Sequence, residues 1–263
     1  MRVLFIGDVV ARPGRHGVAA VVPGLRRDLA LDLVVANGEN SAGGAGITRA
    51  TAGEIFAAGV DLITTGNHVW HQREALTYLP TTDRVVRPLN FPSGTPGRGA
   101  TLYKVRETSV LLANALGRVF MAPLDDPFRA LDAALLEYEG RASVIIVDFH
   151  AEATSEKRAL GFHLDGRASL VVGTHTHVPT ADAQVLPRGT AYVTDVGMVG
   201  PAYSVIGVEV APVVERYLSA LPQRAGTARD TTITFNAVLA DIDPATGRAH
   251  SMERVDRTVV ISD

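Results

Sequence analysis

Short hydrophobic runs alternate with amphipathic stretches along the first part of this chain. The runs are rich in Val, Leu and Ile at successive positions, which is typical of strands buried on both faces of a sheet. We predict such strands over residues 3–6, 31–36, 61–65, 143–149 and 170–172. Helical spacing between the first three strands predicts helices over 18–29 and 50–58, with Thr48 as the N-cap of the second. This alternation predicts βαβ units in a layered α/β fold.

The remaining segments are expected to contain more β-structure. Further strands are predicted over residues 100–105, 109–113, 183–186, 190–193, 231–240 and 249–260. Residues 243–247 read as the hairpin turn between the last two strands. Further helices are predicted over 128–138 and 211–220. With no internal repeat or linker visible, we expect one domain over 1–263, with a small β-rich elaboration over 181–201.

Composition and charge narrow the class of protein. The chain has 263 residues, 46% of them hydrophobic and 20% charged, so it can bury an ample core. Its net charge of −3 provides no basic field for strong nucleic-acid binding. The absence of cysteine excludes disulfides, thiolate nucleophiles and thiolate metal sites. No apolar stretch approaches the ~18 residues of a membrane span and no signal peptide is visible, so we expect a cytoplasmic enzyme without membrane association.

Polar residues directly follow each of the five strands that are predicted to be buried. The carboxyl ends of parallel strands share one edge of a sheet, and ligands bind at that edge. We therefore expect the side chains that follow the five strands to lie close together. The segments are Gly7-Asp8, Asn37-Gly38-Glu39-Asn40, Gly66-Asn67-His68, Asp148-Phe149-His150 and Gly173-Thr174-His175-Thr176-His177.

The donor atoms in these segments suit two cations better than one. His175 and His177 stand two positions apart on an extended segment, so both rings can face one point. A catalytic zinc takes about three protein ligands, whereas two ions ~3.5–4 Å apart can share seven donors with one bridging carboxylate. A sulfur-free set fits divalent or mixed-valent ions of iron, manganese or zinc. The seven predicted metal ligands are Asp8, Glu39, Asn40, Asn67, His150, His175 and His177.

Single residues of this set also have structural explanations. Asp8 stands where a helix N-cap would, and Gly66-Asn67 is a common turn. His71 could contact substrate or cap a helix, and we favour the structural role. His150-Ala151-Glu152 matches half of the zinc deaminase signature, but that chemistry also needs cysteines, which this chain lacks. Five polar segments after five strands are harder to explain by structure alone, so we predict a metal site.

The same segments resemble the signature of the calcineurin-like metallophosphoesterase superfamily. Two departures from that signature are Val10, where a histidine is usual, and Glu39-Asn40, where the usual motif has a bridging aspartate. Together with residues 38–48 and 194–198, they resemble the bacterial YmdB-type branch over nearly the whole chain. The resemblance implies a four-layered α/β-β-α sandwich of the metallophosphoesterase type. It also implies two metal ions and phosphodiesterase activity on small cyclic nucleotides, of the 2′,3′-cyclic kind.

The resemblance further implies roles for individual residues. Asp8, Asn40 and His177 would hold one ion and Asn67, His150 and His175 the other, with Glu39 bridging them. His68 would be the catalytic general acid or would stabilise the phosphate. In related enzymes an aspartate three residues after the bridging carboxylate orients that histidine, and here the position is Ala42.

Two other functions stay open at this point. The same pair of metals could serve a phosphomonoesterase or nucleotidase, because the metals do not define the leaving group. A nucleotide- or RNA-binding regulatory protein with slow turnover is the other alternative. In each enzymatic case the partner is a small phosphoester substrate, and a homo-oligomer is left open. Residues 194–200 are a candidate segment for closing over the pocket.

Overall fold

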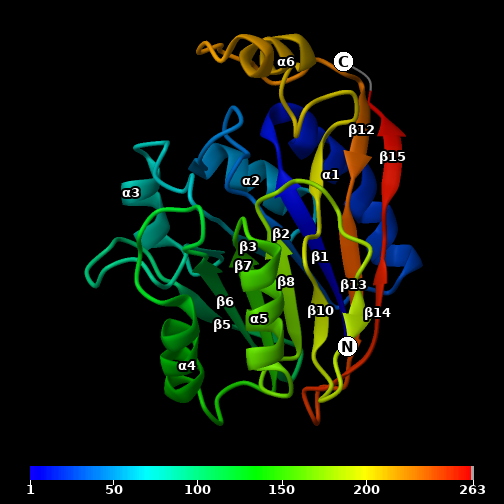
Figure 1. Ribbon diagram of the computed structural model, residues 1–263. Coiled ribbons are helices and arrows are strands. Elements are labelled where there is room, and N and C mark those ends of the chain that lie inside the picture. Colours follow the sequence, from blue (N-terminus) through cyan, green and yellow to red (C-terminus); the bar gives the residue numbers. More distant parts are fainter. Residues whose placement is uncertain (262–263) are drawn as a thin grey trace.

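Two β-sheets pack face to face between two layers of helices in the computed structural model, which describes residues 1–261 (Figure 1). This arrangement is the predicted four-layered α/β-β-α sandwich. The predicted domain limits of 1–263 end outside the described residues, and the domain assignment stays a prediction. Within residues 1–261, no helix is both long and apolar enough to cross a membrane.

The first sheet has nine strands and carries the first three of the predicted buried strands. Its main path runs β15-β12-β11-β1-β2-β3-β4. Off this path, β13 pairs with residues 2–6 of β1, on the same edge that β11 occupies at residues 8–9, and β14 pairs with β13. β1, β2, β3 and β4 are mutually parallel, and β11 is parallel to β1. The strands are β1 (Arg2–Val9), β2 (Leu33–Asn37), β3 (Leu62–Thr64), β4 (Val85–Val86), β11 (Met198–Pro201), β12 (Thr232–Phe235), β13 (Ala237–Ile242), β14 (Ala249–Arg254) and β15 (Arg257–Val260).

The second sheet has six strands in the order β5-β6-β7-β8-β10-β9. The run from β6 to β10 is parallel, with antiparallel strands at both edges. Its strands are β5 (Ala100–Val105), β6 (Thr108–Leu116), β7 (Val144–His150), β8 (Leu170–Thr174), β9 (Gln184–Val185) and β10 (Ala191–Val193).

Helices cover the outer faces of the two sheets. On the first sheet, α1 (Ala11–Asp28) packs over β1, β11 and β12, and α2 (Arg49–Ala57) lies beside α1 and contributes to the same core. On the second, α4 (Pro127–Glu137) and α5 (Thr154–Leu164) pack over β6, β7 and β8. As predicted, Thr48 caps α2, and the Thr48 hydroxyl oxygen accepts a hydrogen bond from the Thr51 amide. Two short helical segments, α3 (Ala75–Tyr78) and η1 (Leu79–Thr81), follow β3, and α6 (Val210–Ser219) lies beyond the carboxyl end of β1 (Figure 1).

The core explains why the β1 sequence is hydrophobic at successive positions. Val3 and Phe5 point into the core between the two sheets, whereas Leu4 and Ile6 point into the core beneath α1 and α2. All four side chains are fully buried. Since alternate residues of a strand face opposite sides, a strand covered on both faces needs a continuous apolar run.

Several expectations for the C-terminal half were wrong in detail. The predicted strands over 231–240 and 249–260 are each interrupted, at Asn236 and at residues 255–256. The Asn236 side-chain oxygen accepts a hydrogen bond from the Met198 amide, and the Asn236 side-chain nitrogen donates one to Asp256. As a result β12 pairs with β15, while β13 pairs with β14 and with β1.

Residues 181–201 are not an elaboration, because they contribute strands to both sheets. β9 and β10 extend the second sheet, and β11 lies beside β1 in the first. All four residues of β11 are buried, so residues 194–200 do not close over a pocket. The helix α5 was not predicted.

Candidate metal centre

The predicted ligands meet where strands of both sheets end at one rim. The argument from strand ends placed them at one edge of a parallel sheet, whereas in the two-sheet sandwich β1, β2 and β3 belong to the first sheet and β7 and β8 to the second. Because the sheets stack face to face with these ends together, residues from both reach the same place. His150 Nδ1 of β7, for example, lies 3.9 Å from Asp8 Oδ1 of β1, and both side chains are fully buried.

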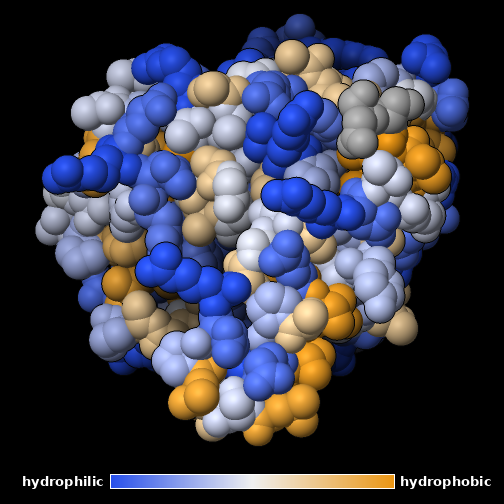
Figure 2. Space-filling model, turned by 90° about the horizontal axis from the view of Figure 1, so that it is seen from above, coloured by the Kyte–Doolittle hydropathy of each residue, from blue (hydrophilic) through white to orange (hydrophobic). Residues whose placement is uncertain are grey.

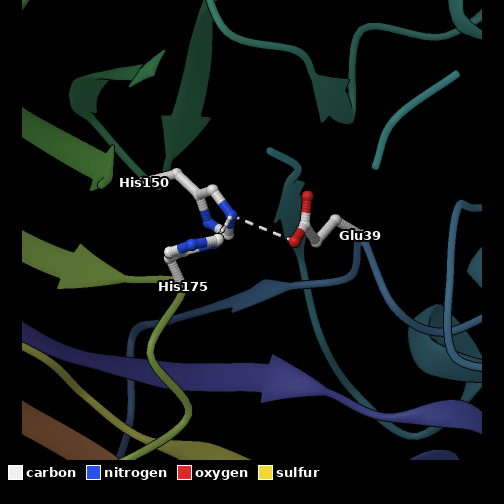
Figure 3. A group of neighbouring side chains, drawn as sticks. All are labelled: Glu39, His150 and His175. Atoms are coloured by element: carbon white, nitrogen blue, oxygen red, sulfur yellow. Dashed lines mark hydrogen bonds and ion pairs between the residues drawn. The ribbon is translucent and has the colours of Figure 1, made fainter. Parts of the chain in front are cut away.

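One group of donor atoms converges on His150 Nε2. Asn67 Oδ1 lies 2.9 Å from this nitrogen, Glu39 Oε1 3.0 Å and His175 Nδ1 3.1 Å. The ligand atoms of Glu39, His150 and His175 all lie within 4.8 Å of one another. Figure 3 shows the two rings and the carboxylate pointing toward one another from separate elements. Four side chains therefore direct oxygen or nitrogen atoms at one small volume.

A second group adjoins the first through Glu39. His177 Nε2 lies 3.0 Å from the Asn40 amide nitrogen and 3.7 Å from Asp8 Oδ1. The same amide nitrogen lies 3.3 Å from Glu39 Oε1. Turning the Asn40 amide over would place its oxygen at this point instead, since the two orientations have the same shape. The seven predicted residues thus form one connected cluster, with Glu39 between two sets of three.

Two observations test whether this cluster fits metal ions. Among residues 1–261, Asp8 Oδ1 is a buried atom without a hydrogen-bond partner. A buried carboxylate oxygen is costly unless a donor or a cation meets it. Gly66 leaves space for the group around His150 Nε2, because a Cβ at this position would overlap Glu39 Oε2 and the His150 ring. The donors are all oxygen or nitrogen, so the residues present fit divalent cations.

The turn that carries His175 and His177 has an unusual backbone. Both residues have positive φ, 102° and 64° respectively. Non-glycine residues rarely adopt this conformation, and it persists only where neighbouring groups enforce it. Here the His175 amide donates to Asp8 Oδ2 at 3.1 Å, and the Thr176 amide donates to Asp195 Oδ2 at 3.1 Å.

A buried ion pair anchors Asp195. Lys157 Nζ of α5 donates to Asp195 Oδ2 at 2.7 Å and to the Thr174 carbonyl at 2.8 Å. Both charged side chains are 1% exposed. Lys157 and Asp195 therefore connect the unpredicted helix α5 to the histidine turn.

Polar residues beneath the centre orient the His150 ring. His150 Nδ1 lies 2.8 Å from the Thr174 hydroxyl, which donates to Asp148 Oδ1 at 2.7 Å. Since the hydroxyl gives its proton to Asp148, it accepts from His150 Nδ1, and Nε2 is the nitrogen that faces the centre and can bind a metal ion once its proton is displaced. Asp148 also accepts from the Asn37 amide and the Thr64 hydroxyl, and its burial raises its pKa. Asp148 stands two residues before His150 on β7, a spacing that places both side chains on the same face.

Glu152 orients the His175 ring in the same manner. Its Oε2 lies 3.1 Å from His175 Nε2, on the opposite side of the ring from Nδ1. A carboxylate on the far nitrogen of a histidine is the usual support for a metal ligand. Glu152 was not predicted, because the His-x-Glu motif was considered only as part of a deaminase signature.

Burial and mutual charge shift the pKa values of the central residues. Burial raises the pKa of Asp8 to about 6, against the opposing charges of His177 and His150. Burial alone would raise the pKa of Glu39, but the charge and hydrogen bond of His150 outweigh it and lower the value to about 2. The same pairing overcomes burial at His150 and raises its pKa to about 9. For His175, burial and the neighbouring His150 lower the pKa to about 3. Strong perturbation at one cluster is typical of a functional site.

His68 lies beside the cluster and is oriented without a carboxylate. Its backbone amide donates to Glu39 Oε2 at 2.9 Å, and its ring stacks on His71 with the centroids 4.6 Å apart. Among the described residues no group hydrogen-bonds to His68 Nδ1. Burial lowers the pKa of His68, against the opposing charge of Glu39. His71 thus contacts His68 by stacking and not by a hydrogen bond. The capping role favoured for His71 was wrong, because Glu74 is the N-cap residue of α3.

Known proteins share this sequence and fold. A model of the family described as YmdB-like protein matches residues 4–255. The 2′,3′-cyclic-nucleotide 2′-phosphodiesterase of Bacillus subtilis (strain 168) is 46% identical over 255 residues, covering 97% of this chain and 96% of that protein. A crystal structure described as a novel phosphatase from Mycoplasma pneumoniae aligns with a TM-score of 0.93 at 32% identity, covering 98% of this chain and 93% of the other. The calcineurin-like phosphoesterase YfkN from Bacillus subtilis shares the fold, with a TM-score of 0.60, 12% identity and coverage of 100% and 92%.

Proposed function

The chain belongs to the YmdB-like family, and on that premise we propose that it is a phosphodiesterase that hydrolyses 2′,3′-cyclic nucleotides. The family assignment and the fold confirm the resemblance drawn from the sequence. One observation carries the proposal for the site: oxygen and nitrogen donors from Glu39, Asn67 and His175 converge on His150 Nε2, and the nearby Asp8 Oδ1 accepts no hydrogen bond from residues 1–261.

The calcineurin-like phosphoesterase fold implies divalent metal ions, and we assign their ligands as two sets. Asp8, Asn40 and His177 would hold one ion, and Asn67, His150 and His175 the other. Glu39, in contact with both sets, would bridge them. When bound, such ions neutralise phosphate charge and make a water molecule acidic enough to be a nucleophile near neutral pH. Iron, manganese and zinc all suit these donors.

The protein's own groups position the substrate and move the proton. Water adds to phosphorus and the bond from phosphorus to the ribose 2′ oxygen breaks, which leaves a 3′-nucleotide. We assign His68 as the general acid that protonates the departing 2′ oxygen. Its Nδ1 is buried and has no hydrogen-bond partner in the described part of the chain, so Nε2 is the nitrogen that can exchange the proton. The stacked His71 limits rotation of the His68 ring.

Two further expectations accompany this proposal. The net charge of −3 argues against strong nucleic-acid binding, so the expected partner is a small phosphoester. The cytoplasmic location stays a prediction from the sequence, and a homo-oligomer stays open.

Metal analysis combined with substrate profiling tests the proposal. Purified protein would be assayed for bound metal and for hydrolysis of 2′,3′-cAMP, 3′,5′-cAMP and p-nitrophenyl phosphate, with Mn²⁺ and with chelator. We expect two ions per chain and chelator-sensitive conversion of 2′,3′-cAMP to 3′-AMP. Two bound ions with turnover of p-nitrophenyl phosphate alone would make the protein a phosphomonoesterase. Absence of metal after reconstitution would overturn the assigned site.

A further inference from the structure

A cavity of about 500 Å³ adjoins the metal centre, and of the seven proposed ligands only His177 lines it. His68 and His177 form part of its wall, so the cavity is continuous with the place where the phosphate would react. Its volume lies in the range of about 300–1,000 Å³ typical of small-molecule sites, and a phosphate group alone would leave most of it empty. The cavity therefore has room for the rest of a substrate molecule.

Residues 205–227, here called the cap, form one wall of this cavity. The base of the cap is a short antiparallel ladder, in which the Glu209 amide donates to the Gly226 carbonyl and the Ala228 amide to the Gly207 carbonyl, each at 3.0 Å. The helix α6 projects from this ladder. Figure 2 looks down on this end of the molecule, where hydrophilic residues cover much of the surface and hydrophobic residues gather mainly along the lower edge and at the right of the view.

One hydrogen bond joins the cap to the metal centre. His177 Nδ1 lies 2.8 Å from the Ile206 carbonyl and donates to it, which leaves His177 Nε2 to face Asp8 and Asn40. Ile206 has a φ of 48°, and a β-branched residue in this conformation is uncommon and strained. The cap is thus held in a defined place beside a proposed ligand.

The chemistry of the cavity wall suits a planar, hydrogen-bonding ligand. Val205 and Val208 provide apolar surface, while Arg216 and Gln223 provide polar groups. Tyr217 also lines the cavity although its side chain is 77% exposed, so one face of its ring is free. The Arg216 guanidinium lies 5.3 Å from the centre of that ring. A tyrosine and an arginine side by side offer the stacking surfaces on which nucleobases bind.

We propose that this cavity binds the nucleoside part of the substrate, with the base stacked on Tyr217 and Arg216 and the cyclic phosphate at the metal centre. This inference rests on the proposed phosphodiesterase function and adds the residues that recognise the base. Gly43, Gly44 and Ala45 also line the cavity, and because they have almost no side-chain bulk they leave space for the ribose. The Gln223 amide supplies both a donor and an acceptor for the edge of a base.

Tyr217→Ala in the metal-loaded enzyme tests this assignment. Two substrates would be compared: 2′,3′-cAMP and the 2′,3′-cyclic phosphate of methyl riboside, which has no base. Loss of stacking should lower kcat/KM for 2′,3′-cAMP by about 5- to 100-fold, with the methyl riboside substrate changed by less than about twofold. Tyr217→Phe keeps the ring and should retain the wild-type value.

Leu218→Ala and Arg224→Ala are matched controls on the cap. Leu218 is 79% exposed on the same helix, and neither residue lines the cavity. Both variants should behave as wild type toward both substrates. An equal loss on the two substrates, or no loss with Tyr217→Ala, would overturn the nucleoside assignment.

Wild-type activity separates this proposal from the function on which it rests. Turnover of 2′,3′-cAMP that is insensitive to Tyr217→Ala would overturn the cavity assignment and leave the phosphodiesterase function in place. No turnover of 2′,3′-cAMP by metal-loaded wild type, with turnover of another phosphoester, would overturn both. Calorimetric binding of 3′-AMP and ribose 3-phosphate gives a second readout, and only 3′-AMP should lose affinity in Tyr217→Ala.

Discussion

The metal centre has a buried floor, by which we mean Asp8, Glu39, His150 and the polar groups bonded to them, and an exposed cap above it. These two regions differ in burial. The Asp8, Glu39 and His150 side chains on the floor are at most 1% exposed, and each lies in a network of buried polar groups. On α6 of the cap only Val213 is buried, and Leu218 is largely exposed. A buried network tolerates little change, whereas an exposed helix tolerates much. The metal ligands thus lie in a rigid floor, and exposed positions of the cap such as Leu218 can vary without disturbing it.

The largest expected effect comes from the carboxylate at the middle of the floor. Glu39→Gln keeps the shape of the side chain but removes the charge between the two sets of donors. We expect turnover of 2′,3′-cAMP to fall by at least about 10³-fold, with loss of bound metal. Metal analysis and steady-state kinetics would be measured on the same preparation. Glu107→Gln, on the surface, is the control and should match wild type; an active, metal-loaded Glu39→Gln would remove Glu39 as the bridge.

His68→Ala should lower turnover by about 10²- to 10⁴-fold while metal content stays near the wild-type value. The reason is that His68 donates a proton but lies outside both sets of proposed ligands. His71→Ala removes only the stacking partner and should have a smaller effect. Full activity in His68→Ala would exclude it from the mechanism, and loss of metal would make it a ligand.

Lys157→Met tests how far the floor depends on its buried ion pair. Removal of one partner leaves Asp195 buried and unpaired, so the free energy of unfolding should fall by about 3–5 kcal/mol. The adjacent Arg158 pairs with Asp182 at 3.4 Å, and both of these side chains are more than a quarter exposed. Arg158→Met should therefore cost about 0–1 kcal/mol. Denaturant unfolding of the two variants compares a buried pair with an exposed pair on one helix, and equal losses would contradict this account.

Glu152→Gln should weaken metal binding by about 10- to 100-fold, because His175 loses the carboxylate that orients it. Titration of the metal-free protein with Mn²⁺ would measure this directly. Glu156→Gln, on the same helix as Lys157, is the comparison, since Glu156 hydrogen-bonds to the Arg118 and Val119 amides rather than to the centre. Unchanged Mn²⁺ affinity in Glu152→Gln would show that Glu152 does not orient His175 for metal binding.

The smallest effect is expected on the cap. Leu218→Ala should change the free energy of unfolding by no more than about 0.5 kcal/mol, because this side chain is exposed and packs little. Denaturant unfolding would measure the change. A loss above 1 kcal/mol would mean that the cap packs more firmly than its exposure indicates, and the contrast with the floor would weaken.

The parts of the fold that could be predicted from the sequence are those that carry a local signal. β1 was predicted because a strand covered on both faces is hydrophobic at every position. The helix α5 was missed because it buries a lysine, Lys157, whose partner Asp195 lies 38 residues away. The interruption at Asn236 also depends on distant partners, Met198 and Asp256. A single sequence does not reveal which distant residues will meet.

The same distinction applies to the candidate site. The seven proposed ligands were identified because each follows a strand, and the fold brings them together. Glu152 and Asp148 were not assigned, since their importance depends on which nitrogen of a histidine faces the centre. That orientation is a property of the assembled site. The orienting residues therefore became visible only in three dimensions.

The hydrogen bond from His177 to the Ile206 carbonyl makes the two regions thermodynamically linked. A molecule in the cavity that holds Ile206 in place also reduces the freedom of the His177 ring. Linkage is reciprocal, so a cation that fixes His177 must favour the occupied cap by the same free energy. One contact between a rigid floor and an exposed cap is thus enough to make metal affinity and substrate affinity depend on each other.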